Sequence, residues 1–413
     1  MTRRPRRIAG WSVLTGCFLL GFFHRFAPAT FADALSVEFA AGEAELGALA
    51  AWHFWVYTAA QVPAGLLVDR YGARVCVATG SLVTAAGSLA LSSAGGLAVA
   101  SAGPVLTGAG LSVVFVGIMK YNAAWFRPES YGLVTGVTLL LGSCGAVIAG
   151  SPTAWLLERY DWRLLFAAAA LTGLALSLAV ALVVRDRPAL GSAPRTRPRH
   201  TARSGLVVAL RSRAMWPLLV ATVGTNGTFY AFAGLWGVPL LTETRGLSNT
   251  VAAWYTTTAL AVYGVGCLVI GLWSDRAGRR RPYLLATSGM AVAGWSGLAL
   301  LPWEAGWQAM GLYVLVGAAA SQVTISFAAL KESVPGPVAA TALALLNTGV
   351  FAASAVLQPL FGLVLDGGFG WRPALLLMAG GSAVGLLAAL GARETGCRPL
   401  ATSGEPLLTT RPG

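Results

Sequence analysis

The chain has 413 residues, of which 56% are hydrophobic and only 11% charged, and its formal net charge at pH 7 is +13. Its mean hydropathy of +0.68 excludes a water-soluble domain and indicates an all-α membrane protein. The three His and five Cys show no HExxH, CxxC or similar spacing, so we expect no metal and no cofactor.

Twelve apolar runs follow one another, separated by short clusters of Gly, Pro, Arg or Asp. Each approaches the roughly 20 residues that a helix needs to cross a bilayer. The first has a basic front, as a secretory signal does, but eleven more runs follow it, so we expect it to be retained. The 12 predicted transmembrane helices are 8–30, 46–67, 75–95, 100–123, 131–153, 163–184, 214–236, 250–273, 282–302, 308–329, 338–364 and 372–391.

The basic residues indicate the orientation. Of the 29 Lys and Arg, 23 lie in the N-terminus, the C-terminus and the loops after even-numbered spans, four lie in the loops after odd-numbered spans, and two lie inside spans. By the positive-inside rule, both termini and the middle loop are predicted to be cytoplasmic, in the inner membrane of a bacterium. The net charge is thus a topology signal, and we expect no nucleic-acid partner because no basic face with stacking aromatics is present.

A polar stretch rich in Arg, Pro and Ser divides six spans from six. The predicted units are a cytoplasmic N-terminus 1–7, an N-terminal six-helix bundle 8–184, a cytoplasmic linker 185–213, a C-terminal six-helix bundle 214–391 and a cytoplasmic tail 392–413. The decapeptides GLLVDRYGAR (65–74) and GLWSDRAGRR (271–280) share G-x-x-x-D-R-x-G-x-R at an offset of 206 residues. Because each half holds six spans and starts on the same side of the membrane, the halves are predicted to be parallel repeats with a site where they meet.

The decapeptide after the second span of each half resembles the signature loop of the major facilitator superfamily (MFS). The twelve spans with a basic middle loop match the six-plus-six plan of that family over about residues 8–391. The resemblance implies the MFS fold and a secondary transporter that works by alternating access. It also implies that the first, fourth, seventh and tenth helices line a central cavity.

The two signature loops are also predicted to act as gates. A tight turn needs Gly where the helices crowd, which Gly72 and Gly278 supply. The resemblance implies that Asp69 faces the helix opening at 335–341, and Asp275 the helix opening near Ser130, while the cytoplasmic side is closed. The predicted gating residues are Gly65, Asp69, Arg70, Gly72, Arg74, Gly271, Asp275, Arg276, Gly278 and Arg279.

Two cations lie inside spans, Arg25 in the first and Lys120 in the fourth. A charged side chain at the bilayer centre costs about 2.5 to 3.5 kcal/mol on insertion scales, so one that is retained generally faces a cavity or a partner. The acidic residue nearest to Arg25 is Asp33, beyond the end of the span. We therefore expect an anionic substrate bound by Arg25 with help from Lys120. In the alternative reading, Arg25 pairs with Asp33 or extends to the outer interface, and Lys120 extends to the cytoplasm.

Further polar residues inside the spans are candidates for substrate binding and proton coupling. His53 shares a helical face with Tyr57 and Gln61, and its imidazole, like that of His24, can titrate near neutral pH, although a packing role is the alternative. The predicted substrate-binding residues are Arg25, Lys120, His24, Tyr57, Gln61, Asn226, Tyr230, Tyr263, Gln322 and Asn347, and the predicted proton-coupling residues are His53 and Asp33.

The stretch HRFAPATFADAL (24–35) resembles, more loosely, the first helix of the organophosphate:phosphate antiporter branch and of related sugar-phosphate and organic-anion permeases. That branch holds phosphate between two arginines, one from each half. Residues 214–236 contain no second Arg, so a monovalent or carboxylate anion fits at least as well as a phosphate ester. We expect a monomeric symporter for a small organic anion, with protons as the candidate coupling ion.

Two other functions stay open at this point. The stretch GAVIAGSP in the fifth span weakly resembles the Gly-Pro signature of drug/proton antiporters, so efflux of drugs or metabolites is the first alternative. A receptor or sensor that kept the fold and lost transport is the second. An enzyme is disfavoured because the spans contain no paired acids, no nucleophile with its base and no metal ligands, and the absence of GxxxxGK[ST] disfavours ATP-driven transport.

Overall fold

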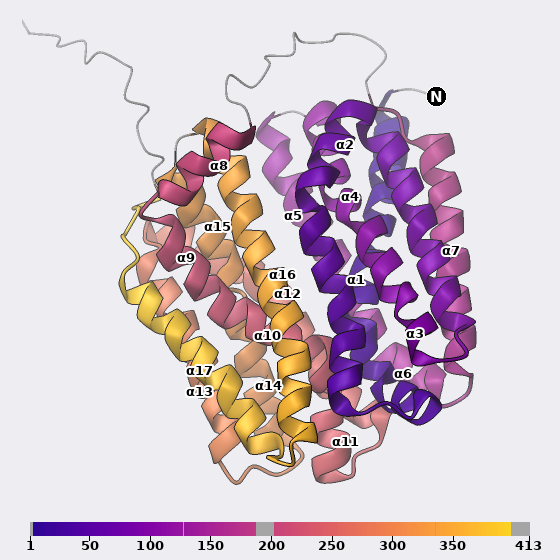
Figure 1. Ribbon diagram of the computed structural model, residues 1–413. Coiled ribbons are helices and arrows are strands. Elements are labelled where there is room, and N and C mark those ends of the chain that lie inside the picture. The colour runs from indigo at the N-terminus through magenta and orange to yellow at the C-terminus, as the bar shows by residue number, and fades with distance from the viewer. Residues whose placement is uncertain (1–2, 127, 187–201, 335, 398–413) are drawn as a thin grey trace, which may run out of the picture.

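The computed structural model describes residues 3–126, 128–186, 202–334 and 336–397, and the regular elements within them are helices. Figure 1 shows two helical bundles side by side, one containing α1 to α7 and the other α9 to α17. The end of the molecule at which α1 begins and α8 lies is called the linker end below. The opposite end, at which α11 lies, is called the far end.

The N-terminal bundle is built from long helices. α1 (Arg3–Phe39) runs the length of the molecule as one helix and contains Pro28. α2 (Glu43–Ser92) consists of two helices joined at Gly72, whose φ of 88° is a left-handed conformation that Gly adopts without strain. The remaining helices are α3 (Leu97–Ala100), α4 (Ala102–Trp125), α5 (Pro128–Ala149), α6 (Ser151–Leu157) and α7 (Trp162–Val183).

The C-terminal bundle follows α8 (Ala202–Arg211). A turn at Gly278, with φ of 62°, ends its first long helix and corresponds to the turn at Gly72 in the other half. Its helices are α9 (Met215–Thr222), α10 (Thr228–Ala231), α11 (Pro239–Arg245), α12 (Asn249–Ala277), α13 (Arg281–Leu300), α14 (Trp307–Ala320), α15 (Gln322–Ser333), α16 (Gly336–Asp366) and α17 (Trp371–Leu390).

The predicted span 214–236 is not one regular α-helix. Two π-helical segments, η1 (Val223–Gly227) and η2 (Phe232–Trp236), flank α10. The chain is pressed against its neighbours here, since a Cβ atom at Gly227 would lie 2.8 Å from the Cβ atom of Ala353 in α16. π-helical segments inside α-helices occur frequently at functional sites.

Ten helical segments within the described residues are long and apolar enough to cross a membrane. They begin at Pro63 and end at Leu390, so α1 and the part of α2 before Pro63 are not among them. The count of twelve spans and the orientation of the termini stay predictions, and so do the domain boundaries. Most of the predicted linker, residues 187–201, lies outside the described residues.

The two bundles are bonded to each other near the far end. The Asn249 side chain of α12 donates a hydrogen bond to the carbonyl oxygen of Thr30 in α1 at 2.9 Å. The carboxylate of Asp366, at the end of α16, accepts hydrogen bonds from the backbone N–H groups of Glu43 and Ala44 at 3.0 and 2.9 Å. Asp366 therefore caps the first turn of α2 across the interface between the halves.

Candidate functional site

A cavity of about 240 Å³ lies between the bundles and is called the central cavity below. Helices α1, α2, α4 and α5 line it from the N-terminal half, and α10, α12, α15 and α16 line it from the C-terminal half. Its wall is mainly apolar and aromatic, and Arg25 is the residue that brings a charge to it among the described residues. A concave, apolar pocket with a few polar groups is the usual form of a small-molecule site.

Arg25 is buried, with 6% of its surface exposed. Its guanidinium carbon lies 4.5, 5.0 and 5.3 Å from the ring centres of Phe351, Phe22 and Tyr57. Its Nε atom has no hydrogen-bond partner, and no carboxylate within the described residues forms an ion pair with it. Arg25 does not pair with Asp33, which was the alternative reading of the sequence. Asp33 is exposed and lines neither described cavity near Arg25.

Aromatic rings stabilise a buried guanidinium only in part. A cation over a ring gains about 0.5–2 kcal/mol, and the rings carry no net charge that would neutralise it. Arg25 therefore sits in the central cavity as a cation whose positive charge the described residues leave unbalanced. An anion in this cavity would supply the missing charge and form charge-assisted hydrogen bonds with the guanidinium.

Five more of the predicted binding residues line the two cavities. Tyr57, Tyr230, Tyr263 and Asn347 lie in the wall of the central cavity, and His24 lies in that of a second cavity. The hydroxyl groups of Tyr230 and Tyr263 are hydrogen-bonded to each other at 2.8 Å. The pair joins α10 to α12 in the cavity wall to which Arg25 also belongs.

The second cavity, of about 40 Å³, is lined mainly by the N-terminal half, with Leu235 from the other half, and is called the histidine cavity below. Arg25, His24, His53, Ser88 and Thr107 are among the residues that line it, so Arg25 borders both cavities. His53 contacts the Thr107 hydroxyl through Nδ1 at 3.2 Å, while its Nε2 has no hydrogen-bond partner among the described residues. A cavity of this size with several polar groups is large enough to hold water.

His24 is held by two hydrogen bonds. Its Nδ1 lies 2.9 Å from the carbonyl oxygen of Leu20, which can only accept, so Nδ1 carries a proton. Its Nε2 lies 2.6 Å from the Ser88 hydroxyl. The Ser88 hydroxyl can donate to Nε2 of a neutral imidazole, or turn to donate to the carbonyl oxygen of Thr84 at 3.1 Å and accept from a protonated one.

The structure places Lys120 away from both cavities. Its Nζ donates to the carbonyl oxygen of Val68 at 2.5 Å and forms an ion pair with Asp69 at 3.2 Å. The side chain therefore reaches the first signature loop at the linker end, as in the alternative reading of the sequence. Gln61, Asn226 and Gln322 line neither described cavity, and each has a buried side-chain atom without a hydrogen-bond partner.

The first signature loop is fastened to the end of the N-terminal bundle. Asp186, just after α7, accepts a hydrogen bond from the backbone N–H of Arg74 at 2.9 Å, and the Arg74 side chain donates to the carbonyl oxygen of Ala181 at 2.9 Å. Arg70 lies over the ring of Tyr71. Gly65 has open space around it, where a larger side chain would fit.

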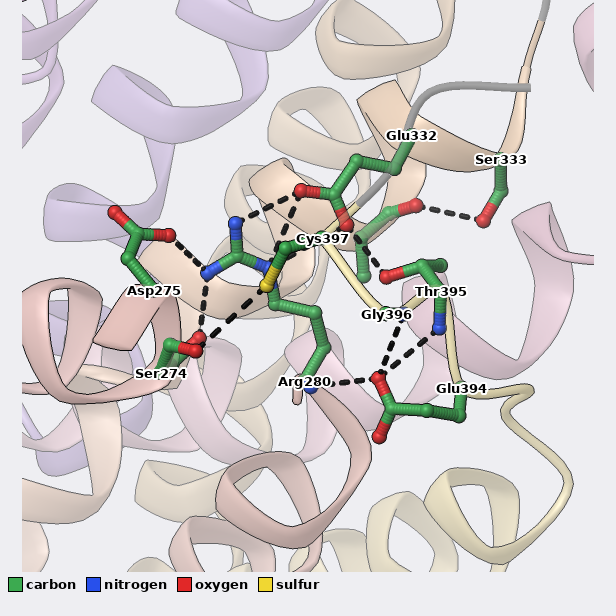
Figure 2. Close-up of polar contacts among 10 residues, drawn as sticks. Ser274, Asp275, Arg280, Glu332, Ser333, Glu394, Thr395, Gly396 and Cys397 are labelled. Carbon is green, nitrogen blue, oxygen red and sulfur yellow. Dashed lines mark hydrogen bonds and ion pairs between the residues drawn. The ribbon is translucent and has the colours of Figure 1, made fainter. Parts of the chain in front are cut away.

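The second signature loop is fastened in the same way, by a larger network (Figure 2). Arg280 forms ion pairs with Asp275 at 2.5 Å and with Glu332 of α15 at 2.8 Å. Glu394, just after α17, accepts hydrogen bonds from the backbone N–H groups of Arg280 and Arg281 at 2.7 and 2.9 Å. Burial disfavours the Glu394 carboxylate, but these N–H groups stabilise it and hold its pKa below the usual value.

Sequence reasoning missed three members of this network. Arg280 occupies the position that corresponds to Arg74, at the offset of 206 residues, whereas Arg279 was predicted. Glu332 and Glu394 carry no motif of their own. The structure places Gly271 beside the Thr324 side chain, at 3.2 Å from a Cβ atom built on it, and Arg276 in the last turn of α12.

The predicted gating partners of the two signature loops lie at two helix openings. Pro335 and the side chains of Pro337 and Ser130 lie outside the described residues. The contacts of Asp69 and Asp275 with these two helix openings stay predictions.

Comparisons with known proteins agree with the architecture. The family model of the Major Facilitator Superfamily matches residues 13–237 and 227–406. The computed structure is similar to a bacterial homolog of the human lysosomal transporter Spinster in an inward-facing and unoccupied conformation, with a TM-score of 0.75, 16% identity and coverage of 94% of this chain and 98% of that chain. It is also similar to a D-xylose-proton symporter, with a TM-score of 0.75, 15% identity and coverage of 95% and 99%. At these identities the likeness shows a shared fold.

Relatives found by sequence match only part of the chain. The uncharacterized transporter YybO of Bacillus subtilis (strain 168) is 24% identical over 299 residues, which are 69% of this chain and 63% of YybO. The multidrug resistance protein MdtH of Salmonella newport (strain SL254) is 30% identical over 107 residues, which are 26% of each chain. The chain thus spans less than two thirds of the length of these relatives. Because the family model covers both halves of the chain, this protein belongs to the Major Facilitator Superfamily, whose members are multi-pass membrane transporters.

Proposed function

We propose that this protein is a secondary active transporter that moves a small organic anion across the inner membrane of a bacterium by alternating access. The observation that carries the proposal is Arg25, a buried guanidinium in the wall of the central cavity without a carboxylate of its own among the described residues. Twelve spans in two parallel repeats, a monomer and a cytoplasmic linker end belong to the same proposal.

Arg25 contacts both halves of the protein, so an anion bound to it acts on both. It extends from α1, while Phe351 over its guanidinium belongs to α16 of the other half. A buried cation is costly to bring into a low-dielectric interface without an anion. Binding of a carboxylate therefore lowers the electrostatic cost of closing the two halves around Arg25, which is what alternating access requires.

The contacts between the halves support an inward-open state. The bonds of Asn249, Asp366 and Ser151 to the opposite half lie toward the far end, the last through the Thr257 hydroxyl at 3.0 Å. If the linker end is cytoplasmic, as the basic residues predict, these bonds close the outer side. The central cavity then loads or releases substrate on the cytoplasmic side.

Proton coupling through the histidine cavity is part of the proposal. His53 and Arg25 line the same small cavity. Nε2 of His53 has no partner among the described residues, so it can accept a proton or a hydrogen bond from water. Positive charge on Arg25 opposes a second positive charge on His53, so an anion bound to Arg25 makes protonation of His53 easier. Anion and proton would then cross together, as in a symporter, with Asp33 at the far end as the proton entry.

Drug efflux is the second candidate, favoured by the partial similarity to MdtH and by the aromatic wall of the central cavity. The sign of the substrate separates the two candidates. The positive charge of Arg25 repels a cationic drug, and neither described cavity has an acidic residue in its wall that would attract one.

A thermal-shift screen of the purified protein tests the proposal, with anionic, zwitterionic and cationic metabolites as ligands. We expect stabilisation by anions that disappears in Arg25→Met, which removes the charge and keeps most of the side-chain volume. Lys120→Met is the matched control, since it removes a cation that lies outside both cavities, and it should keep the response. Stabilisation by cations alone, equal in wild type and Arg25→Met, would contradict the proposal.

A further inference from the structure

We infer that the anion is a monocarboxylate with a small apolar body, preferably a flat one, and that dicarboxylates, phosphate monoesters and sugars are poor substrates. The inference rests on the proposed function of the same cavity and names its substrate class. It follows from the number of charges, the occupied polar groups and the size of the central cavity.

The charge of the site matches a single negative charge. Among the described residues in the wall of the central cavity, Arg25 is the one cation, and the structure places Lys120 on Asp69 instead. A guanidinium offers a planar fork that one carboxylate fills with two parallel hydrogen bonds. A second carboxylate, or a phosphate monoester of about −1.5 to −2 charge, would bring charge into an apolar cavity without a partner.

Three of the hydroxyl groups in the wall of the central cavity are bonded to other groups of the protein. The hydroxyl groups of Tyr230 and Tyr263 bond each other, and the Ser143 hydroxyl donates to the carbonyl oxygen of Leu140 at 2.7 Å. Besides Arg25, the wall then has Tyr57, Thr324 and Asn347 to bond a sugar, so several hydroxyl groups of a sugar would stay unpaired, at about 1–3 kcal/mol each. The wall is therefore unsuited to a sugar, although a sugar symporter shares the fold.

The rest of the wall suits an apolar body. Phe18, Phe115 and Phe327 line the cavity together with Leu140, Leu268 and Val323. The rings of Phe22, Tyr57 and Phe351 surround the guanidinium at 4.5 to 5.3 Å, so a group attached next to a bound carboxylate meets aromatic surface first. Burial of apolar surface gains about 25 cal/mol per Å², and flat rings stack well on such a wall.

The size of the cavity limits the body. Its volume of about 240 Å³ is below the roughly 300–1,000 Å³ of pockets for drug-sized ligands. An acid with a single ring or a short branched chain fits this space.

Titration calorimetry of the purified full-length protein against four matched probes tests the inference. The probes are phenylacetate, the neutral isostere phenylacetamide, the dicarboxylate phthalate and the phosphate monoester phenyl phosphate. We expect phenylacetate to bind at least tenfold more tightly than each of the other three, and Arg25→Met to reduce its affinity to that of phenylacetamide. Arg25→Lys keeps the charge but loses the fork, and should retain weaker, intermediate binding.

A second variant tests the apolar body separately. Phe327→Ala removes a ring of the cavity wall other than the three over Arg25, and should weaken phenylacetate while leaving acetate unchanged. If neither Arg25 variant folds, the ranking of the four probes on wild type decides alone.

The outcomes separate the inference from the function on which it rests. Tighter binding of phthalate or phenyl phosphate than of phenylacetate, dependent on Arg25, overturns the inference and leaves anion transport standing. Absence of phenylacetate binding also overturns the inference. Failure of every anionic probe and metabolite, with binding of cations unaffected by Arg25→Met, overturns the proposed function as well.

Discussion

The guanidinium of Arg25 in α1 lies 4.5 Å from the ring centre of Phe351 in α16, so a charge carried by one half of the protein touches an aromatic ring of the other half. The two residues are separated by most of the chain, and each lines the central cavity. A change in the charge balance at Arg25 therefore acts where the halves meet.

Replacement of Arg25 by Met should stabilise the protein while abolishing anion binding. A cation in a membrane span costs about 2.5 to 3.5 kcal/mol on insertion scales, and the described residues offer Arg25 only aromatic rings in return. Residues at functional sites commonly lower the stability of the protein in exchange for activity. Melting temperatures without ligand, measured for wild type and Arg25→Met, check this.

A structural role for Arg25 predicts the opposite, a lower melting temperature for Arg25→Met. Arg163→Met is the control, because Arg163 has an acidic partner in Glu38 at 2.8 Å. It should not stabilise the protein.

Replacement of Gly47 by Val should open the far end. A Cβ atom at Gly47 in α2 would lie 2.7 Å from the carbonyl oxygen of Gln358 in α16, which is too close for contact. The helices must move apart there, and the state with a closed far end is disfavoured. Val37 and Phe369 are 84% and 70% exposed and suit spin labels. Pulsed electron paramagnetic resonance should report a longer distance between the two labels in Gly47→Val than in the protein without this substitution.

Gly311→Val is the matched control for this substitution, since a Cβ atom at Gly311 has open space around it. An unchanged distance between the labels in Gly47→Val, equal to that of the control, would show that this contact does not hold the far end closed.

Closure of the far end should depend on pH through Glu43. Burial, together with the nearby carboxylates of Glu243, Asp366 and Asp33, raises the pKa of Glu43 to about 7 in this conformation. When the far end opens, the carboxyl group enters water and its pKa returns toward 4.5. The closed state therefore binds the proton more tightly, so its advantage is present at low pH and is lost as the pH rises from about 4.5 through about 7.

The same pair of labels measures this effect between pH 5 and pH 8. The share of the closed state should fall with rising pH in wild type, and Glu43→Gln, which stays neutral, should flatten the curve. A curve for Glu43→Gln that follows the wild type would assign the pH dependence to another group.

The two ion pairs of the signature loops should contribute unequally to stability. The side chains of Arg280 and Glu332 are 8% and 12% exposed, whereas those of Lys120 and Asp69 are 35% and 80% exposed. Glu332→Gln should lower the free energy of unfolding by about 3 kcal/mol or more, the usual cost of breaking a buried pair. Lys120→Met should change it by about 1 kcal/mol or less.

Denaturant unfolding in detergent measures both values. Equal effects of Glu332→Gln and Lys120→Met would mean that the network in Figure 2 contributes no more than a surface pair.

The family and the turns could be predicted from the sequence because they depend on local chemistry. A repeated loop with Gly at the point of reversal indicates the same turn twice, and Gly72 and Gly278 both have left-handed backbones. The π-helical segments η1 and η2 could not be predicted, since they follow from how closely this helix packs against α16 and α17. Residues Gly224 and Gly227 were the signal in the sequence, but Gly is common throughout this chain.

The candidate site was predictable where it depends on charge and not where it depends on packing. Arg25 stood out as a cation in an apolar run, and the structure places it in the cavity wall. Lys120 stood out for the same reason, but the reach of its long side chain toward Val68 and Asp69 takes it out of the cavity. Phe22 and Phe351 could not be recognised, because Phe is an ordinary packing residue in a membrane helix and only the meeting of the halves brings these two to Arg25.

The most direct measurement of the central claim is counterflow of a labelled anion into proteoliposomes that contain wild type, Arg25→Met or Lys120→Met. The account predicts anion-dependent exchange in wild type and Lys120→Met, and background uptake in Arg25→Met despite normal insertion and an equal or higher melting temperature. Exchange in Arg25→Met at the wild-type rate and affinity would contradict it, because the buried guanidinium would then have no part in binding the substrate.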